Sequence, residues 1–269
     1  MKILTLQEVQ AESLRVLMEF DAFCRNNSLE YSIAYGTLIG AIRHKGFIPW
    51  DDDIDVYMTR PQYEKFIHLY KDSKDFAMVY PGKDECTVCY GRLCDMSRTR
   101  VVSKSPWTSL DCGVWIDIFP VDAVPEDAEA TRKKFLRCHR MYRRLLGKRR
   151  VQRYWSSGKF ADKLKAIPTF LLNGSDPAGY AARMDRYFTE FSYGSTPKVM
   201  VLSAPMGKRV VRNPIAEFGS YIDLPFEDKT VMAVAAYDSV LTNQFGDYMT
   251  PPPADQQVRG HSVHTYTWR

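Results

Sequence analysis

The sequence has no long hydrophobic run, and nothing in it approaches the roughly 20 consecutive apolar residues that a bilayer-spanning helix needs. Its first residues, MKILTLQEVQAESLRVL, are interrupted by Gln7, Glu8, Gln10 and Glu12, where a signal peptide requires a continuous apolar segment. It also lacks a Gly/Ser-rich linker and an internal repeat. We therefore expect a cytoplasmic protein, built as one large domain or two small ones.

Cysteine is scarce, with 6 residues among 269, and the sequence contains one CxxC pair, formed by Cys86 and Cys89. A structural zinc site usually joins two such pairs, so zinc is not the favoured interpretation. In a cytosolic chain the simpler prediction is that the cysteines are reduced, buried thiols.

Positive charge is concentrated in one segment. Between Arg132 and Arg153 there are 11 Lys and Arg and no acid, whereas the remaining residues hold 26 basic and 32 acidic side chains. This segment is either a solvated helix face or a surface for a polyanionic acceptor or for peripheral contact with an anionic membrane. We expect no nucleic-acid partner, because no nucleic-acid-binding motif accompanies the charge.

The order of the predicted elements favours an α+β fold, in which helices alternate with strands early and helices dominate later. Helices are expected at residues 5–24, 37–44, 60–71, 126–150, 160–172, 180–191 and 230–245. Strands are expected at residues 31–35, 76–80, 89–94, 99–102, 114–119, 199–202 and 221–224, besides the strand that carries Asp53 and Asp55. We predict a core of residues 1–125, a basic helical subdomain of residues 126–195, and a part of residues 196–269 that packs back on the core and ends in a Pro-rich surface tail.

Three acids lie on two otherwise apolar strands. Asp53 and Asp55 share one face of the strand that follows the acidic loop, and Asp117 lies within VWIDIF. A buried carboxylate needs a partner, and if the two strands are neighbours the three carboxylates converge. A divalent cation, Mg²⁺ or Mn²⁺, would then relieve their repulsion and serve in phosphoryl transfer. An EF-hand is excluded, because Val56 and Gln62 occupy the positions of its Gly and Glu.

The stretch before these acids suits a phosphate. Gly36 permits close approach of the backbone, and Thr37 is expected to cap the following helix and leave amide donors for a phosphate. Arg43 and His44, at the far end of that helix, are candidates to reach the phosphate or the acids. The remaining substrate-binding candidates near the acids are Trp50, for stacking on a base, and Asp51.

The stretch YGTLIGAIRHKGFIPWDDDIDVYMTRPQYEKF strongly resembles the signature of the LicD family of phosphocholine transferases, to which fukutin is similar, and GVWIDIFPVDAVP and FGDYMTPPP resemble it too. The resemblance implies a nucleotidyltransferase-type core, a small mixed sheet flanked by helices. In it Gly36 and Thr37 match a Gly-Ser motif, Asp53 and Asp55 the metal-binding pair, and Asp117 the third catalytic acid. It also makes Arg92, in YGRLCD, a candidate phosphate contact.

The implied reaction is transfer of phosphocholine from CDP-choline to a hydroxyl of a cell-surface glycan (teichoic acid, lipopolysaccharide or capsule), with release of CMP. The acceptor is expected to be a glycan that can be lipid-linked. The alternatives are transfer of another CDP-linked phospho-alcohol (ribitol, glycerol or ethanolamine), a nucleotide-sugar glycosyltransferase that uses DxD, and a degenerate scaffold. An aromatic cage drawn from Trp50, Trp107, Trp115 and tyrosines of the tail would suit choline.

Overall fold

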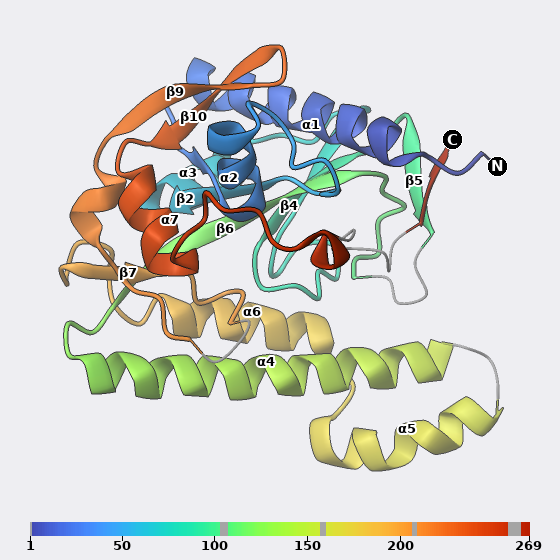
Figure 1. The fold of residues 1–269 in the computed structure, drawn as a ribbon. Coiled ribbons are helices and arrows are strands. Elements are labelled where there is room, and N and C mark those ends of the chain that lie inside the picture. Colours follow the sequence, from blue (N-terminus) through green and yellow to red (C-terminus); the bar gives the residue numbers. More distant parts are fainter. Residues whose placement is uncertain (1, 103–106, 157–159, 206–208, 258–264) are drawn as a thin grey trace.

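A mixed sheet lies at the centre of the molecule, and helices cover it (Figure 1). The computed structural model describes residues 2–102, 107–156, 160–205, 209–257 and 265–269. The sheet has the order β1-β2-β6-β4-β3, and β7 pairs with both β6 and β8. Its strands are β1 (Ser32–Ile33), β2 (Asp55–Thr59), β3 (Phe76–Val79), β4 (Gly91–Asp95), β6 (Trp115–Val124), β7 (Lys198–Met200) and β8 (Asn213–Pro214). The predicted α+β class is confirmed.

Three N-terminal helices lie against the sheet: α1 (Leu6–Asn26), α2 (Tyr35–Arg43) and α3 (Arg60–Leu69). Helix α1 begins with the predicted capping box, in which Thr5 and Glu8 satisfy each other's backbone amides. On its inner face the ring of Phe20 meets those of Tyr31, just before β1, and Phe66, on α3, both at 4.9 Å between centroids. These buried edge-to-face contacts fix α1 against α3 and the start of β1.

Strand β6 continues through Pro120, although Pro120 was predicted to end it. Asp117 donates its amide to Ile54 on β2 at 2.9 Å, so the nitrogen of residue 120 lies on the opposite side of the strand. On that side the pairing with β4 ends at Ile118, and the pairing with β7 begins only at Asp122. The missing proline amide therefore falls in the gap between two partner strands, where no ladder bond is lost.

The C-terminal part contains more strand than predicted. The helix expected at residues 230–245 is wrong in its first half, which forms β10 (Lys229–Val234) paired with β9 (Tyr221–Phe226); only α7 (Tyr237–Phe245) is helical. Short 3-10 turns lie at Ile215–Phe218 and Ala254–Gln256. The tail was expected to be a loop, but β11 (Thr265–Trp268) pairs with β5 (Thr99–Val102) and meets Ile3, so the two termini lie together. Residues 258–264 of that tail lie outside the described residues.

The three remaining helices, α4 (Ala128–Ser156), α5 (Phe160–Asn173) and α6 (Pro177–Phe188), form a layer beside the sheet. Figure 1 shows α5 on the side of α4 that faces away from the sheet. Within the described residues, no helix is long and apolar enough to cross a membrane. All six cysteines are buried free thiols, as predicted. The division at residues 125 and 195 stays a prediction.

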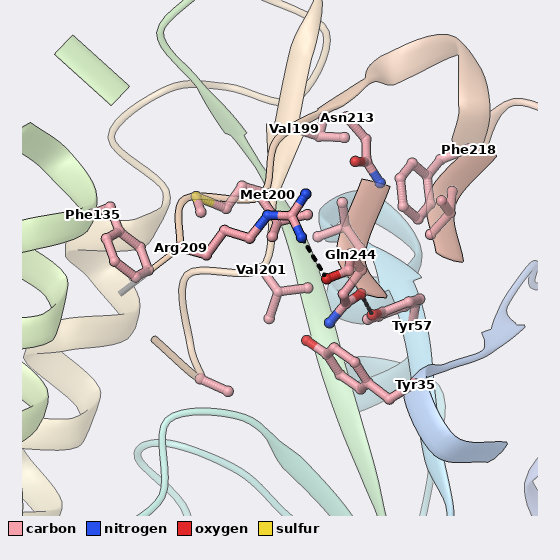
Figure 2. Close-up of a pocket in the computed structure, with 14 residues that line it drawn as sticks. Tyr35, Tyr57, Phe135, Val199, Met200, Val201, Arg209, Asn213, Phe218 and Gln244 are labelled. Atoms are coloured by element: carbon pink, nitrogen blue, oxygen red, sulfur yellow. Dashed lines mark hydrogen bonds between the residues drawn. The ribbon is translucent and has the colours of Figure 1, made fainter. Parts of the chain in front are cut away.

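A small pocket of about 80 Å³ lies beside the sheet where β2 approaches α7. Gln244 is at its centre (Figure 2): its side-chain oxygen accepts from the Tyr57 hydroxyl at 3.1 Å, and its backbone carbonyl accepts from Arg209 at 3.3 Å. Tyr35 and Phe218 complete an aromatic wall. Because a guanidinium already lies in this pocket, it disfavours a second cation.

Candidate functional site

The two strands that carry acids are neighbours, as predicted. Strands β2 and β6 run parallel, and Asp55 lies directly opposite Asp117. Both side chains are half-buried. By contrast, the residues on either side of Asp117 on β6 and the residue after Asp55 on β2 are buried. We call Asp53, Asp55 and Asp117 the acid row. Two carboxylates at paired positions of adjacent strands repel each other unless a cation lies between or beside them.

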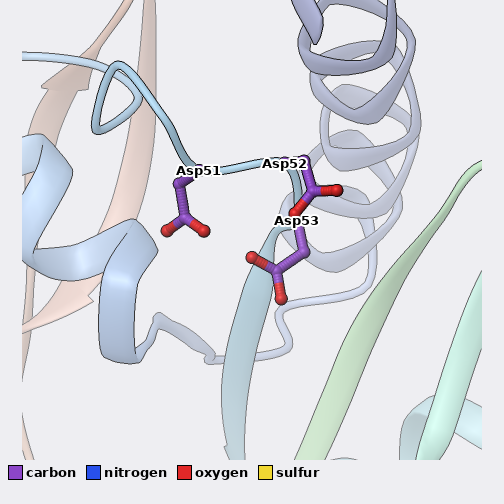
Figure 3. Close-up of side chains that lie close together, drawn as sticks. All are labelled: Asp51, Asp52 and Asp53. Atoms are coloured by element: carbon purple, nitrogen blue, oxygen red, sulfur yellow. The ribbon is translucent and has the colours of Figure 1, made fainter. Parts of the chain in front are cut away.

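A second acidic group lies at the start of this row. It consists of Asp51, Asp52 and Asp53, each of which offers an oxygen within 4.8 Å of the others. Within the described residues this is the group that meets that spacing, and the full acid row does not meet it. Figure 3 shows the carboxylates of Asp51 and Asp53 turned to one side of the chain and that of Asp52 to the other. A set of carboxylate oxygens fits a hard divalent cation such as Mg²⁺.

Gly36 lies against this acidic loop, and its role in binding phosphate stays a prediction. A Cβ at position 36 would collide with a carboxylate oxygen of Asp51, so the glycine lets the helix start and the loop approach each other. The Gln10 side chain on α1 donates to the Asp51 carbonyl at 2.8 Å and holds the loop from the other side. These two contacts place Asp51 beside the N-terminus of α2.

Thr37 does not cap α2, so that prediction is wrong. The helix begins at Tyr35, Ala34 precedes it without a side-chain cap, and Thr37 is already inside the first turn. Its hydroxyl instead accepts the backbone amide of Asp55 at 3.0 Å and fixes the start of β2. Amides in the first turn have no partner four residues earlier within their own helix, so this end of α2 still suits an anion.

Arg92 is bound to the acid row. It lies opposite Asp117 on β4, and its Nε donates to Asp117 Oδ1 at 2.6 Å. Its guanidinium is 4.2 Å from the ring centroid of Trp107 and 4.5 Å from that of Trp115. Burial alone would lower the pKa of Arg92, but the charge of Asp117 outweighs it and raises that pKa. Trp107 and Trp115, two of the aromatic residues considered for a choline cage, thus already contact a cation of the protein, and a phosphate contact by Arg92 stays a prediction.

Arg43, His44 and Trp50 gather at the other end of α2, about 9 Å along the helix axis from Thr37. Arg43 donates to the Tyr248 carbonyl at 2.9 Å and to His44 at 3.4 Å, and the rings of His44 and Trp50 lie 6.5 Å apart. Burial and the charge of Arg43 lower the pKa of His44. These contacts tie the corner to the segment after α7, and a substrate role for the three residues stays a prediction.

A second arginine near the acid row, Arg149, was not predicted from the sequence to belong to the site. Arg149 lies on the face of α4 that also carries Tyr142, Leu145 and Gln152, and it is half-buried. It forms no hydrogen bond or ion pair with any described residue. Burial lowers its pKa, and the positive charge of Arg92 lowers it further. Only its helical spacing from Leu145 distinguishes it, in sequence, from the solvated arginines around it.

The paired strands, the acid row and Arg92 define a mixed α+β protein with clustered carboxylates of the kind that divalent cations prefer. Residues 28–144 match the LicD/FKTN/FKRP nucleotidyltransferase domain. The chain is 31% identical over 281 residues to the lipopolysaccharide cholinephosphotransferase LicD of Haemophilus influenzae, a match that covers 99% of both chains. An uncharacterized Rickettsia typhi protein is 42% identical over 92 residues, 34% of this chain and 30% of that protein. The chain belongs to the LicD family.

Proposed function

We propose that this protein is a Mg²⁺-dependent phosphocholine transferase that uses CDP-choline as donor and a hydroxyl of a cell-surface glycan as acceptor. The observation that carries the proposal is the full-length similarity to the Haemophilus influenzae lipopolysaccharide cholinephosphotransferase. The pairing of Asp55 with Asp117 supports it, because it assembles the acids at the edge of a phosphate-binding helix start. A nucleotidyltransferase-type arrangement of the sheet is part of the same proposal.

The residues that would hold Mg²⁺ are the acid row, Asp53, Asp55 and Asp117, with Asp51 beside it. The oxygen-only donor set and the 4.8 Å spacing of Asp51, Asp52 and Asp53 fit that ion. When bound, Mg²⁺ supplies charge neutralisation for the transferred phosphoryl group and for the leaving oxygen. Arg92 orients the Asp117 carboxylate through its 2.6 Å contact.

In the proposed step an oxygen of the glycan attacks the phosphorus that carries choline. A new O–P bond forms, the bond from that phosphorus to the bridging oxygen breaks, and the bridging oxygen leaves with CMP. The proton of the attacking hydroxyl passes to a carboxylate of the acid row. The α2 N-terminus and Arg149 contact the donor phosphates and hold the attacking and leaving oxygens in line.

One observation favours a second candidate donor. Trp107 and Trp115 enclose Arg92, and the pocket beside Tyr57 contains Arg209. These two aromatic sites therefore do not offer an open cage to a quaternary ammonium. The second candidate is transfer of a CDP-linked phospho-alcohol without that charge, such as ribitol or glycerol.

The test is donor-dependent nucleotide release. The protein is incubated with Mg²⁺, a phosphate-free glycan acceptor, and CDP-choline, CDP-ethanolamine, CDP-ribitol, CDP-glycerol or a UDP-sugar, and released CMP or UDP is measured. We expect CMP from CDP-choline, none with EDTA, and none from Asp117→Asn. Release from CDP-ribitol or CDP-glycerol alone would favour the second candidate, and release of UDP alone would refute both.

A further inference from the structure

The outermost helix carries a stripe of exposed apolar side chains. Leu164, Ile167 and Leu171 follow one another at helical spacing on α5, with exposed fractions of 51%, 46% and 77%. Trp155 near the end of α4 is 55% exposed, and its ring lies 6.3 Å from that of Phe170 at an angle of 30°. We call Trp155, Leu164, Ile167 and Leu171 the apolar stripe.

Single exposed apolar residues are ordinary, but a stripe of four on one protruding pair of helices is not. Figure 1 shows α5 beside α4, with the sheet on the other side of α4. The stripe thus contributes nothing to the core around the sheet. A partner that covers these four exposed apolar side chains would remove them from water, which is favourable.

The charge beside the stripe identifies the kind of partner. Eight Lys and Arg side chains of α4 are exposed, and residues 132–153 contain no acid: the eight are Arg132, Lys133, Arg137, Arg140, Arg143, Arg144, Arg150 and Arg153. A second copy of the chain would bring an equal set of cations to the same contact, which disfavours self-association. An anionic bilayer offers negative headgroups to the arginines and an apolar boundary to the stripe.

We propose that the α4–α5 hairpin docks in the plane of an anionic lipid bilayer. Leu164, Ile167 and Leu171 enter the boundary between headgroups and acyl chains, Trp155 lies at headgroup depth, and the exposed arginines contact lipid phosphates. The proposal deepens the proposed function, on which it rests only for its purpose: it would bring the acid row to glycans that are carried on membrane lipids. Docking itself requires neither donor nor acceptor.

Flotation with vesicles tests the docking directly. The full chain is mixed with vesicles of phosphatidylglycerol and phosphatidylcholine, or of phosphatidylcholine alone, at low and high salt. We expect recovery with the anionic vesicles that falls as salt screens the arginines, and little recovery with neutral ones. Equal recovery with both lipids, or none with either, would overturn the proposal.

Paired variants separate insertion from simple electrostatic attraction. Ile167→Ser/Leu171→Ser is expected to lower the vesicle partition coefficient at least about tenfold without changing the charge of the protein, because two apolar side chains no longer enter the boundary. The matched control is Leu69→Ser on α3, which removes a leucine that is 44% exposed elsewhere and should leave partition unchanged. Ile167→Gln/Leu171→Gln serves in place of the Ser pair if circular dichroism shows that the latter is unfolded. Unchanged binding by the folded stripe variant would overturn the proposal.

Fluorescence places the stripe in depth. Brominated lipids should quench part of the tryptophan emission of the bound protein, and Trp155→Phe should abolish that part. Quenching that persists in Trp155→Phe, or dimerisation in solution that the stripe variants abolish, would overturn the membrane assignment. Vesicle binding without transfer from any CDP donor would instead refute the proposed function and leave the docking intact.

Discussion

Arg92 and Asp117 stand opposite each other on β4 and β6, with 2.6 Å between Nε and Oδ1 and side chains that are 8% and 13% exposed. On its other side Asp117 lies opposite Asp55. Across the neighbouring strands β2, β6 and β4, the site therefore presents a carboxylate, a second carboxylate and a guanidinium, in that order. The protein itself thus supplies one positive charge that compensates the acid row.

Replacing Arg92 with Met should expose this compensation. The variant leaves Asp117 beside Asp55 without its cation, and breaking such a nearly buried pair costs about 3 kcal/mol of unfolding free energy. We expect urea denaturation to show this loss, and MgCl₂ to restore part of it because a divalent cation relieves the same repulsion. The control is Arg100→Met, whose ion pair is largely exposed and worth about 1 kcal/mol or less. Equal losses in the two variants would contradict the assigned role of Arg92.

The acids of the row should be required for transfer. Asp53→Asn, Asp55→Asn and Asp117→Asn are each expected to lower kcat by about a hundredfold or more, because each removes charge that is needed when the phosphoryl group is transferred. Asp53 and Asp55 are expected to be dispensable for folding, whereas Asp117→Asn leaves the Arg92 guanidinium without its carboxylate partner and should also cost about 3 kcal/mol of unfolding free energy. Steady-state CMP release gives kcat, and circular dichroism checks the fold. Asp255→Asn, at an exposed position of the C-terminal part, is the control. An Asn variant with near-normal turnover would remove that residue from the site.

Arg149 should act on the donor. Losing a charge-assisted contact to a phosphate corresponds to about 1.5 kcal/mol, so Arg149→Met is expected to raise KM for the CDP donor about tenfold. The KM for the acceptor should stay unchanged. Arg150→Met offers a matched control, because it removes the neighbouring arginine, which is exposed rather than half-buried. The same KM in both variants would return Arg149 to the solvated basic face.

The acid row could be predicted from the sequence because its residues violate a strong rule. An acid within a strand as apolar as VWIDIF requires a partner, which indicated that Asp117 would meet Asp53 and Asp55 if the two strands were neighbours; the family resemblance implied that they are. The partner of Asp117 could not be predicted in the same way. Arg92 reaches it through the register between β4 and β6, and register is set by packing across strands rather than by local sequence.

Other differences also come from long-range pairing. Thr37 is of a residue type that commonly caps helices, yet its hydroxyl oxygen accepts a hydrogen bond from the backbone amide of Asp55. Residues 230–234 were predicted to be helical, yet pairing with β9 makes them part of a strand in which Val231 and Ala233 are buried. In both cases a partner distant in sequence outweighs a weak local preference, and only the folded chain reveals that partner.

Acid stability should depend on Asp95, which is fully buried at the end of β4. Its carboxylate accepts the amide of Thr99 at 2.6 Å and the guanidinium of Arg15 at 2.5 Å. Burial alone would raise the pKa of Asp95, but hydrogen bonds from Thr99, Ser97 and Arg98 and the charge of Arg15 outweigh it, so that pKa lies below its ordinary value.

A carboxyl group whose pKa is lowered on folding stabilises the protein fully above its unfolded pKa of about 3.9 and loses that contribution as pH falls through the lower folded value. The unfolding free energy of the protein should therefore fall below about pH 4. Asp95→Asn should be less stable than the parent at neutral pH, and the difference should shrink toward about pH 2, since the variant has no carboxylate to protonate. Asp255→Asn, which changes an exposed acid, should follow the parent at every pH. A deficit of Asp95→Asn that is independent of pH would mean that the shape of the side chain, and not its charge, holds this turn.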